Sequence, residues 1–226
     1  MSGRRGVVSG VMLATLTLAG SLNAQGLDEF DYENLSFRGV GVGVGYVFPD
    51  RVDATTVFGG RFDLGYAGPG FRIVPHTSYW SSSYERSEVQ RFEQQLETLI
   101  TRESGAPSPD VDLGDISLSD FSVGVDGHFV WAVPRIASLT YAGVGMTAHF
   151  LNGSGEAITD TFIEDLIDAL SAGFNVHAGL EYLLSDGARL FGQGKYELMS
   201  DLRYFEVRLG GQIMVGGTLP DERVGS

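Results

Sequence analysis

Polar and apolar residues alternate with a period of two along residues 203–216. One face carries only apolar residues and glycine: Phe205, Val207, Leu209, Gly211, Ile213 and Val215. The other face is mixed and includes Glu206, Arg208 and Gln212. Successive side chains of a strand point to opposite faces. The apolar face would point into the core of a water-soluble barrel, but toward lipid in an outer-membrane barrel.

Seven earlier segments repeat this alternation. They are residues 35–48, 55–67, 71–81, 118–133, 139–150, 174–184 and 189–199. Strands of this length, tilted by about 40°, cross an apolar band of about 25 Å. We therefore predict an all-β fold, an eight-stranded antiparallel up-and-down transmembrane β-barrel with strands roughly over residues 35–216.

The connections differ in length in a regular way. Those around Pro69, Pro134 and Asp186 are short, whereas residues 82–116 and 151–172 form two long excursions. Both excursions fall on the same side of the barrel, as the outer loops of outer-membrane barrels do. Each is predicted to contain an amphipathic helix, Ser87–Arg102 and Thr161–Leu170. Ser87 with Gln90, and Thr161 with Glu164, have the spacing of a capping box.

Glycines occupy every second position at the start of the first strand. Gly39, Gly41 and Gly43 are spaced like part of a dinucleotide-binding fingerprint, but that motif needs a helix directly after its turn. Here the alternation continues to Phe48. The glycines therefore predict a tightly curved barrel wall, with larger side chains opposite them filling the lumen.

The N-terminus indicates where the protein is located, and the composition limits what it can bind. Arg4 and Arg5 precede a mostly apolar run that ends at Ala24, so residues 1–24 read as a signal peptide and residues 25–226 as the barrel domain. The alternative is a membrane anchor, for which the run is short. The 226 residues carry a net charge of −14, which argues against nucleic-acid binding. The absence of cysteine excludes thiol chemistry.

The strand pattern, the signal peptide and the loop asymmetry resemble the small outer-membrane β-barrels of the OmpA and OmpX type. Arg208, Gly210, Ile213 and Val215 match the spacing of the signal that ends many barrel substrates of the assembly machinery, although the usual terminal aromatic is absent. The resemblance implies a location in the outer membrane of a Gram-negative-type envelope. It also implies outer-membrane lipid and the barrel-assembly machinery as partners.

The face opposite the apolar one defines a candidate lumen network of charged residues and all four histidines. Its members are Arg61, Asp63, Arg72, His76, Asp126, His128, His149, His177, Glu181, Lys195, Glu197, Glu206 and Arg208. An unpaired buried charge is costly, and an eight-stranded barrel is narrow enough for side chains to fill. We therefore expect a salt-bridged plug, with a narrow channel or small-ligand transporter as the alternative.

Within that plug we expect the last two strands and the first two to adjoin after closure. This would make Arg61, Asp63, Glu197, Glu206 and Arg208 its centre. No metal site and no cofactor are expected. The histidines lack ligand spacing within any one strand, and we expect them to lie at different depths.

Two further classes of protein compete with a structural role. A secreted lipocalin-like barrel needs an apolar interior, which the charged faces contradict. A lipid-modifying hydrolase is suggested by His76-Thr77-Ser78, which resembles the His-x-Ser arrangement of outer-membrane lipid A deacylases. The parity of the strand points His76 and Ser78 into the lumen, so we expect no enzyme.

The two long excursions are the expected functional surface, because variable function sits on loops held by a rigid scaffold. Residues 82–116 carry eight acids and three bases, and residues 151–172 carry five acids and no base. An extracellular protein or a cation would suit this charge as a partner. The alternative is that the acids only keep the loops soluble.

Overall fold

The computed structural model describes residues 35–105, 111–136, 138–155, 169–200 and 202–215. The predicted signal peptide lies outside these residues. The described elements, in chain order, are β1 (Gly39–Pro49), β2 (Thr55–Asp63), β3 (Tyr66–Gly68), β4 (Phe71–Ser83), α1 (Arg86–Ser104), β5 (Ile116–Val133), the 3-10 turn η3 (Pro134–Ile136), β6 (Ser138–Gly155), β7 (Ala169–Ser185), β8 (Ala188–Leu198) and β9 (Arg203–Met214). No helix among them is long and apolar enough to cross a membrane.

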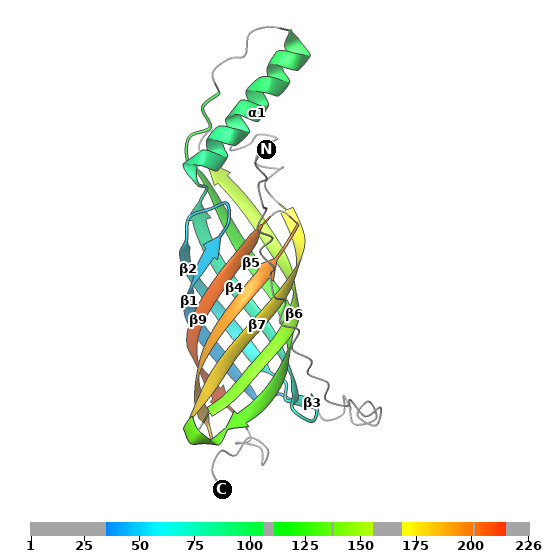
Figure 1. Cartoon of the computed structure of the whole chain (residues 1–226), viewed down its shortest axis with the longest axis vertical. Helices are drawn as coiled ribbons and strands as arrows, with labels where there is room; N and C mark the ends of the chain where they lie inside the picture. The colour runs from blue at the N-terminus through cyan, green and yellow to red at the C-terminus, as the bar shows by residue number, and fades with distance from the viewer. Residues whose placement is uncertain (1–34, 106–110, 137, 156–168, 201, 216–226) are drawn as a thin grey trace, which may run out of the picture.

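The strands form one closed antiparallel barrel, tilted steeply around its long axis (Figure 1). The sheet order runs β2-β1-β9-β8-β7-β6-β5-β4-β3, and the additional pairing of β2 with β4 closes the ring. Both β2 and β3 pair with β4, so they are two pieces of one barrel strand. The predicted eight-stranded up-and-down barrel is therefore confirmed.

The break between β2 and β3 corrects the prediction of one continuous strand over residues 55–67. Gly65 adopts φ = 78°, a left-handed conformation that interrupts the strand and favours glycine. The backbone N–H of Gly65 donates to Asp63 Oδ1 at 2.8 Å, which holds the bend. The carboxylate of Asp63, which points into the lumen, therefore also stabilises the bend in the barrel wall.

The outside of the barrel is apolar along every strand. Exposed residues on it include Val42, Val44, Phe58, Tyr79, Phe121, Val125, Phe129, Met146, Val176, Leu180, Leu190, Leu209 and Ile213. Their neighbours in sequence point inward and are buried, as in β9, where burial alternates residue by residue. A belt of this size would be unstable in water, and it matches the lipid-facing band of a membrane barrel.

The two ends of the barrel differ as predicted. Short connections join β3 to β4, β5 to β6 through η3, and β7 to β8. The long connection between β4 and β5 lies at the opposite end, where α1 rises obliquely above the rim (Figure 1). We call this end the outer end.

Helix α1 lies within two residues of its predicted bounds, but its start differs. The N-cap is Glu85, without a side-chain cap hydrogen bond, so the predicted capping box of Ser87 and Gln90 is wrong. Ser87 lies inside the first turn and its hydroxyl donates to Glu85 instead. The helix ends at Gly105 in the left-handed conformation, a common C-terminal stop.

The second predicted helix is corrected at its end. Ala169 and Leu170 belong to β7, where Leu170 registers with Phe150 of β6. The strands β6 and β7 therefore extend into what we expected to be loop. Their backbone groups are satisfied by pairing with each other. The rest of Thr161–Leu170 lies outside the described residues.

Candidate functional site: the charged lumen

An apolar cluster fills the outer end of the lumen. Its buried members are Val47, Val52, Val57, Trp80, Leu118, Leu202 and Tyr204. Trp80 and Tyr204 meet edge to face, with ring centroids 6.0 Å apart. Because these residues come from both ends of the chain, the cluster ties the first and last strands together at this end.

The inner part of the lumen is organised around Glu181, which is fully buried on β7. Its carboxylate accepts from Arg61 at 2.8 Å, from Arg72 at 2.5 Å and from Arg189 at 3.1 Å. Arg72 also pairs with Asp63 at 3.2 Å. Gln212 of β9 contacts both Arg61 and Asp63 through its amide. Three guanidinium groups therefore share two carboxylates, and Glu181 takes most of the contacts.

A second ion-paired group lies nearer the outer end. His149 lies between Asp120, at 2.9 Å, and Glu197, at 3.4 Å. Lys195 pairs with Glu197 at 3.2 Å, and Arg208 pairs with Glu206 at 2.8 Å.

Between these two groups lies a cluster of imidazoles around Asp126. His76 Nδ1 is 3.3 Å from Asp126 Oδ2, and His177 Nδ1 is 3.8 Å from Asp126 Oδ1. The ring of His128 stacks on Tyr141 with centroids 4.3 Å apart, and lies 4.8 Å from the ring of His177.

Glycines on the lumen face make room for the large charged side chains. The side chain of Arg208 crosses Gly43 and Gly59, where a Cβ atom would lie 3.0 Å from its Cδ and 2.5 Å from its Cζ. Arg61 packs in the same way against Gly41. The glycine-rich first strand thus provides the volume that the arginines occupy.

Every predicted lumen residue is buried, with less than a tenth of its surface exposed. The structure does not bring the expected central five together. Arg61 and Asp63 belong to the Glu181 group, whereas Glu197, Glu206 and Arg208 belong to the group nearer the outer end. Glu181 lies on β7, opposite β2, and pairs with Arg61 across the lumen rather than along the wall.

Among the buried polar residues that the predicted network omits are Asp120, Arg189 and Gln212. Strand parity was sufficient to find them. Arg189 has the parity of Lys195, Asp120 that of Asp126, and Gln212 that of Arg208. Arg189 was overlooked because it stands at the predicted start of its strand.

A small cavity lies in the lumen beside the imidazole cluster. The cavity bordered by His76, Asp126, His128, Lys195 and Arg208 measures about 10 Å³. A single water molecule needs roughly this much. His76 and Ser78 do not form a catalytic pair, because Ser78 Oγ bonds to Ser122 Oγ at 2.7 Å.

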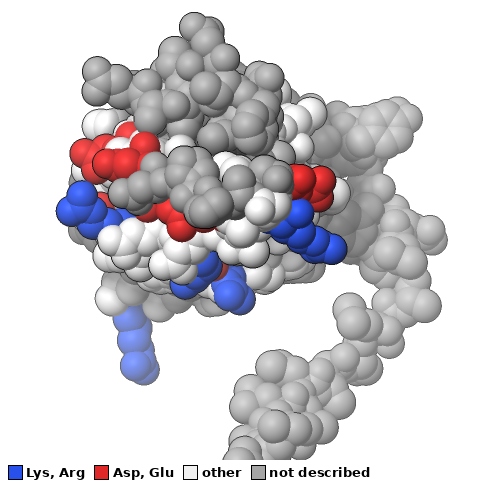
Figure 2. Space-filling model, turned by 90° about the horizontal axis from the view of Figure 1, so that it is seen from above, with Lys and Arg blue, Asp and Glu red and all other residues white. Residues whose placement is uncertain are grey.

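Helix α1 stands beside a larger groove at the outer rim. The groove measures about 540 Å³ and is bordered by Tyr84, Val89, Phe92, Leu118 and Leu151. Seen from this end, both acidic and basic side chains surround the rim (Figure 2). Two acids of α1 are used internally, because Glu93 accepts from the backbone N–H of Leu113 at 2.8 Å and Glu97 from that of Val111 at 3.2 Å.

The closed barrel, the apolar outer belt and the charged interior define a transmembrane β-barrel of the outer-membrane type. Among solved structures, the chain is similar to neisserial surface protein A, with 12% identity, a TM-score of 0.50, and coverage of 79% of this chain and 97% of that one. It is also similar to Ail, the attachment invasion locus protein of Yersinia pestis, with 10% identity, a TM-score of 0.48, and coverage of 80% and 99%.

A major outer membrane protein of Thermus thermophilus matches at 10% identity and a TM-score of 0.49, with 79% of this chain and 99% of that one covered. No protein-family model matches the sequence. A search of curated proteins also finds no match. The fold and the lipid-facing belt together place the protein in the outer membrane of a Gram-negative-type envelope.

Proposed function

We propose that this protein is a non-catalytic outer-membrane barrel, closed by its charged lumen, that presents the β4–β5 connection as an interaction surface. The observation that carries the proposal is the position of α1. This helix of 19 residues stands above a lumen in which the cavity beside the imidazole cluster has room for about one water molecule. Since the interior offers no room for a solute, the outer loop is the part of the molecule left for function.

The base of this connection is built to hold α1 in place. Val89, Leu113 and Ile116 form a buried cluster, against which Phe92 and Leu96 pack. The two glutamate bonds to Val111 and Leu113 tie the returning chain to the helix. A fixed helix loses little entropy when a partner binds, which favours recognition.

Beyond Glu97, α1 exposes apolar surface in the part of the chain that the structure describes. Leu99 is 54% exposed and Ile100 is 38% exposed, next to each other on the helix. Such apolar surface on a held element suits a protein partner. We propose an extracellular protein as that partner, and a cation bound by the loop acids as the alternative. We also propose two further partners. One is outer-membrane lipid, and the other is the barrel-assembly machinery, which would recognise Arg208, Gly210, Ile213 and Val215.

Site-directed photo-crosslinking in intact cells tests the surface role. A crosslinker at Leu99 should give discrete protein adducts, and the same probe at the exposed Gln94 should give few. The double variant Leu99→Asp/Ile100→Asp, probed from Thr98, should lose those adducts while the barrel still migrates as a heat-modifiable band. Equal adducts from Leu99 and Gln94, unchanged by the double variant, would contradict a specific contact.

A further inference from the structure

Residues in register across β5, β6 and β7 form rows, or rungs, of the barrel wall. In two neighbouring rungs the middle residue, on β6, is a glycine. Asp126 on β5 and Asn175 on β7 both register with Gly145 of β6. His128 and His177 register in the same way with Gly143. We expected the histidines to lie at different depths, and the structure places the rings of His128 and His177 with centroids 4.8 Å apart.

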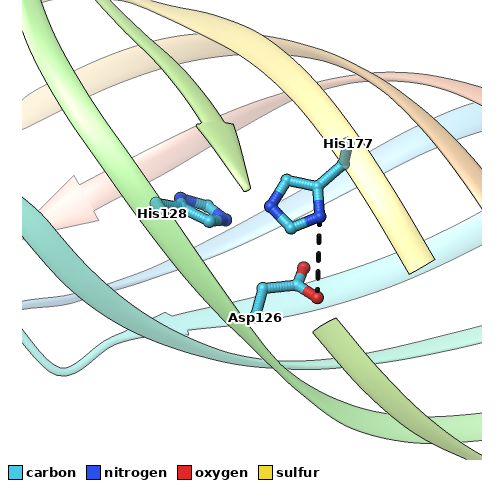
Figure 3. A group of neighbouring side chains, drawn as sticks. All are labelled: Asp126, His128 and His177. Atoms are coloured by element: carbon cyan, nitrogen blue, oxygen red, sulfur yellow. Dashed lines mark ion pairs between the residues drawn. The ribbon is translucent and has the colours of Figure 1, made fainter. Parts of the chain in front are cut away.

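The missing side chains at Gly143 and Gly145 allow the flanking side chains to lean toward each other. A Cβ atom at Gly143 would lie 2.6 Å from His177 Nε2, and one at Gly145 would lie 2.6 Å from Asn175 Nδ2. Asn175 Nδ2 reaches Asp126 Oδ1 across Gly145 at 3.1 Å. As a result, Asp126, His128 and His177 face one another inside the barrel (Figure 3).

The hydrogen bonds around His177 leave one of its nitrogens ready to bind a metal. Its Nδ1 lies 2.7 Å from Asn175 Oδ1. The amide oxygen accepts, so Nδ1 carries the proton and Nε2 carries a lone pair. That Nε2 is buried and has no hydrogen-bond partner in the described part of the chain. A hydrogen bond that fixes the second ring nitrogen is the usual support of a metal-binding histidine.

His128 and Asp126 complete the set. His128 Nδ1 lies 3.2 Å from a guanidinium nitrogen of Arg72, and its Nε2 is likewise buried without a partner among the described residues. One donor atom from each of the three residues lies within 4.8 Å of the others. Donors around a tetrahedral zinc ion are about 3.3 Å apart, so a small rotation of the rings closes the set.

We propose that Asp126, His128 and His177 bind a divalent transition-metal ion, Zn²⁺ being the ion that two imidazoles and a carboxylate suit. Asn175 positions His177, and a fourth ligand position faces the cavity bordered by His76, which has room for one water molecule. For His128 Nε2 to bind the metal as a neutral imidazole, the ring proton moves to Nδ1 and the contact of Nδ1 with Arg72 opens, while Arg72 keeps its pairs with Asp63 and Glu181.

Charged side chains of both signs surround this position. Lys195 and Arg208 border the same cavity, but Lys195 is paired with Glu197, and Arg208 with Glu206. The ion-pair partners of Asp126 in the described chain are imidazoles, those of His76 and His177. Asp126 is only 3% exposed, so its charge is buried without a lysine or arginine in contact. A bound cation would compensate it.

The cluster is enclosed on both sides along the barrel axis. The apolar cluster with Trp80 and Tyr204 lies toward the outer end, and the Glu181 group lies toward the inner end. Zinc therefore enters most readily while the barrel folds, and it stays bound once the barrel has closed.

The test is to refold the purified chain in detergent with excess Zn²⁺, remove free metal with a chelator, and measure zinc by mass spectrometry. We expect about one zinc per folded chain after refolding with the metal, and much less when zinc is added to the already folded barrel. Refolding with Co²⁺ should give the visible absorption of a four-coordinate site.

Variants locate the bound ion. His177→Ala and Asp126→Asn should lower retention at least about 100-fold, and Asn175→Ala about 10- to 100-fold. His149→Gln, which changes the lumen histidine bonded to Asp120, should retain zinc as the wild type does. Heat-modifiable migration verifies that each variant folds. If a ligand variant does not fold, the zinc retained by Asn175→Ala tests the proposal instead. Folded wild type without retained zinc, or equal zinc in His177→Ala, would overturn the proposal.

Discussion

At the scale of single residues, Glu181 holds the inner lumen together. Its two carboxylate oxygens contact three guanidinium groups that come from β2, β4 and β8. Desolvating so many charges is costly, and the cost is recovered only when every partner is in place. Removing Glu181 therefore does more than remove one ion pair.

We predict that Glu181→Gln destabilises the barrel by about 3–5 kcal/mol, because it removes the carboxylate charge that three buried guanidinium groups contact. Urea unfolding of the refolded protein in vesicles measures the change. The matched control is Asp50→Asn, which removes an ion pair to an arginine whose side chain is 63% exposed and should cost less than about 1 kcal/mol. Similar losses in both variants would argue against Glu181 as the centre of the network.

At the scale of elements, the glycines of β1 and β2 that face the lumen make room for large side chains inside the barrel. A strand interior is normally weakened by glycine. Here Gly43 and Gly59 provide the path along which the Arg208 side chain runs. Glycines on the lipid-facing side of the same strand do not line the path of the Arg208 side chain. Glycines on the two faces of one strand can therefore be compared directly.

We predict that Gly59→Ala destabilises the barrel by about 1–3 kcal/mol, because the new methyl group overlaps the Arg208 guanidinium and lies 2.8 Å from the carbonyl oxygen of Thr77. Gly60→Ala, whose methyl group would lie 3.5 Å from Thr77 Cγ2, should be within about 0.5 kcal/mol of wild type. The same urea titration measures both. Equal effects would show that loss of chain flexibility, rather than the room for Arg208, governs this position.

Strand parity was enough to predict which way each residue points, and so the barrel and its buried charges. It was not enough to predict partners. The contact between Arg61 and Glu181 spans 120 residues and depends on the stagger of the closed sheet, which a two-residue period does not encode. The rung shared by His128 and His177 was missed for the same reason. The start of α1 was misplaced because Ser87 and Gln90 have the spacing of a capping box, although Ser87 lies within the first turn of the helix.

At the scale of the whole molecule, the barrel is a filled cylinder with a structured outer end. The apolar cluster, the ion-paired groups and the imidazole cluster succeed one another along its axis, and the cavity between them is about 10 Å³. We expect these side chains to leave no continuous path for a hydrated ion.

We predict that the purified protein shows no stable unitary conductance in planar bilayers. Trp80→Ala/Tyr204→Ala, which removes the two rings of the outer cluster, should remain silent as well, because the ion-paired groups lie below it. Glu181→Ala combined with Arg72→Ala, which takes two long side chains out of the inner lumen, should stay silent for the same reason, because the apolar cluster and the second ion-paired group remain in place. Steady, large openings of the wild type would refute the closed lumen and favour a narrow channel.

The seam between β1 and β9 has a consequence for assembly. Gln212 of β9 contacts Arg61 and Asp63 of β2 across β1, and Tyr204 of β9 packs against Trp80 of β4. These contacts exist only after the last strand has paired with the first. Until then, the arginines of β2 and β4 face an open trough without their final partners. We therefore expect the pairing of β9 with β1 to complete these contacts inside the barrel together.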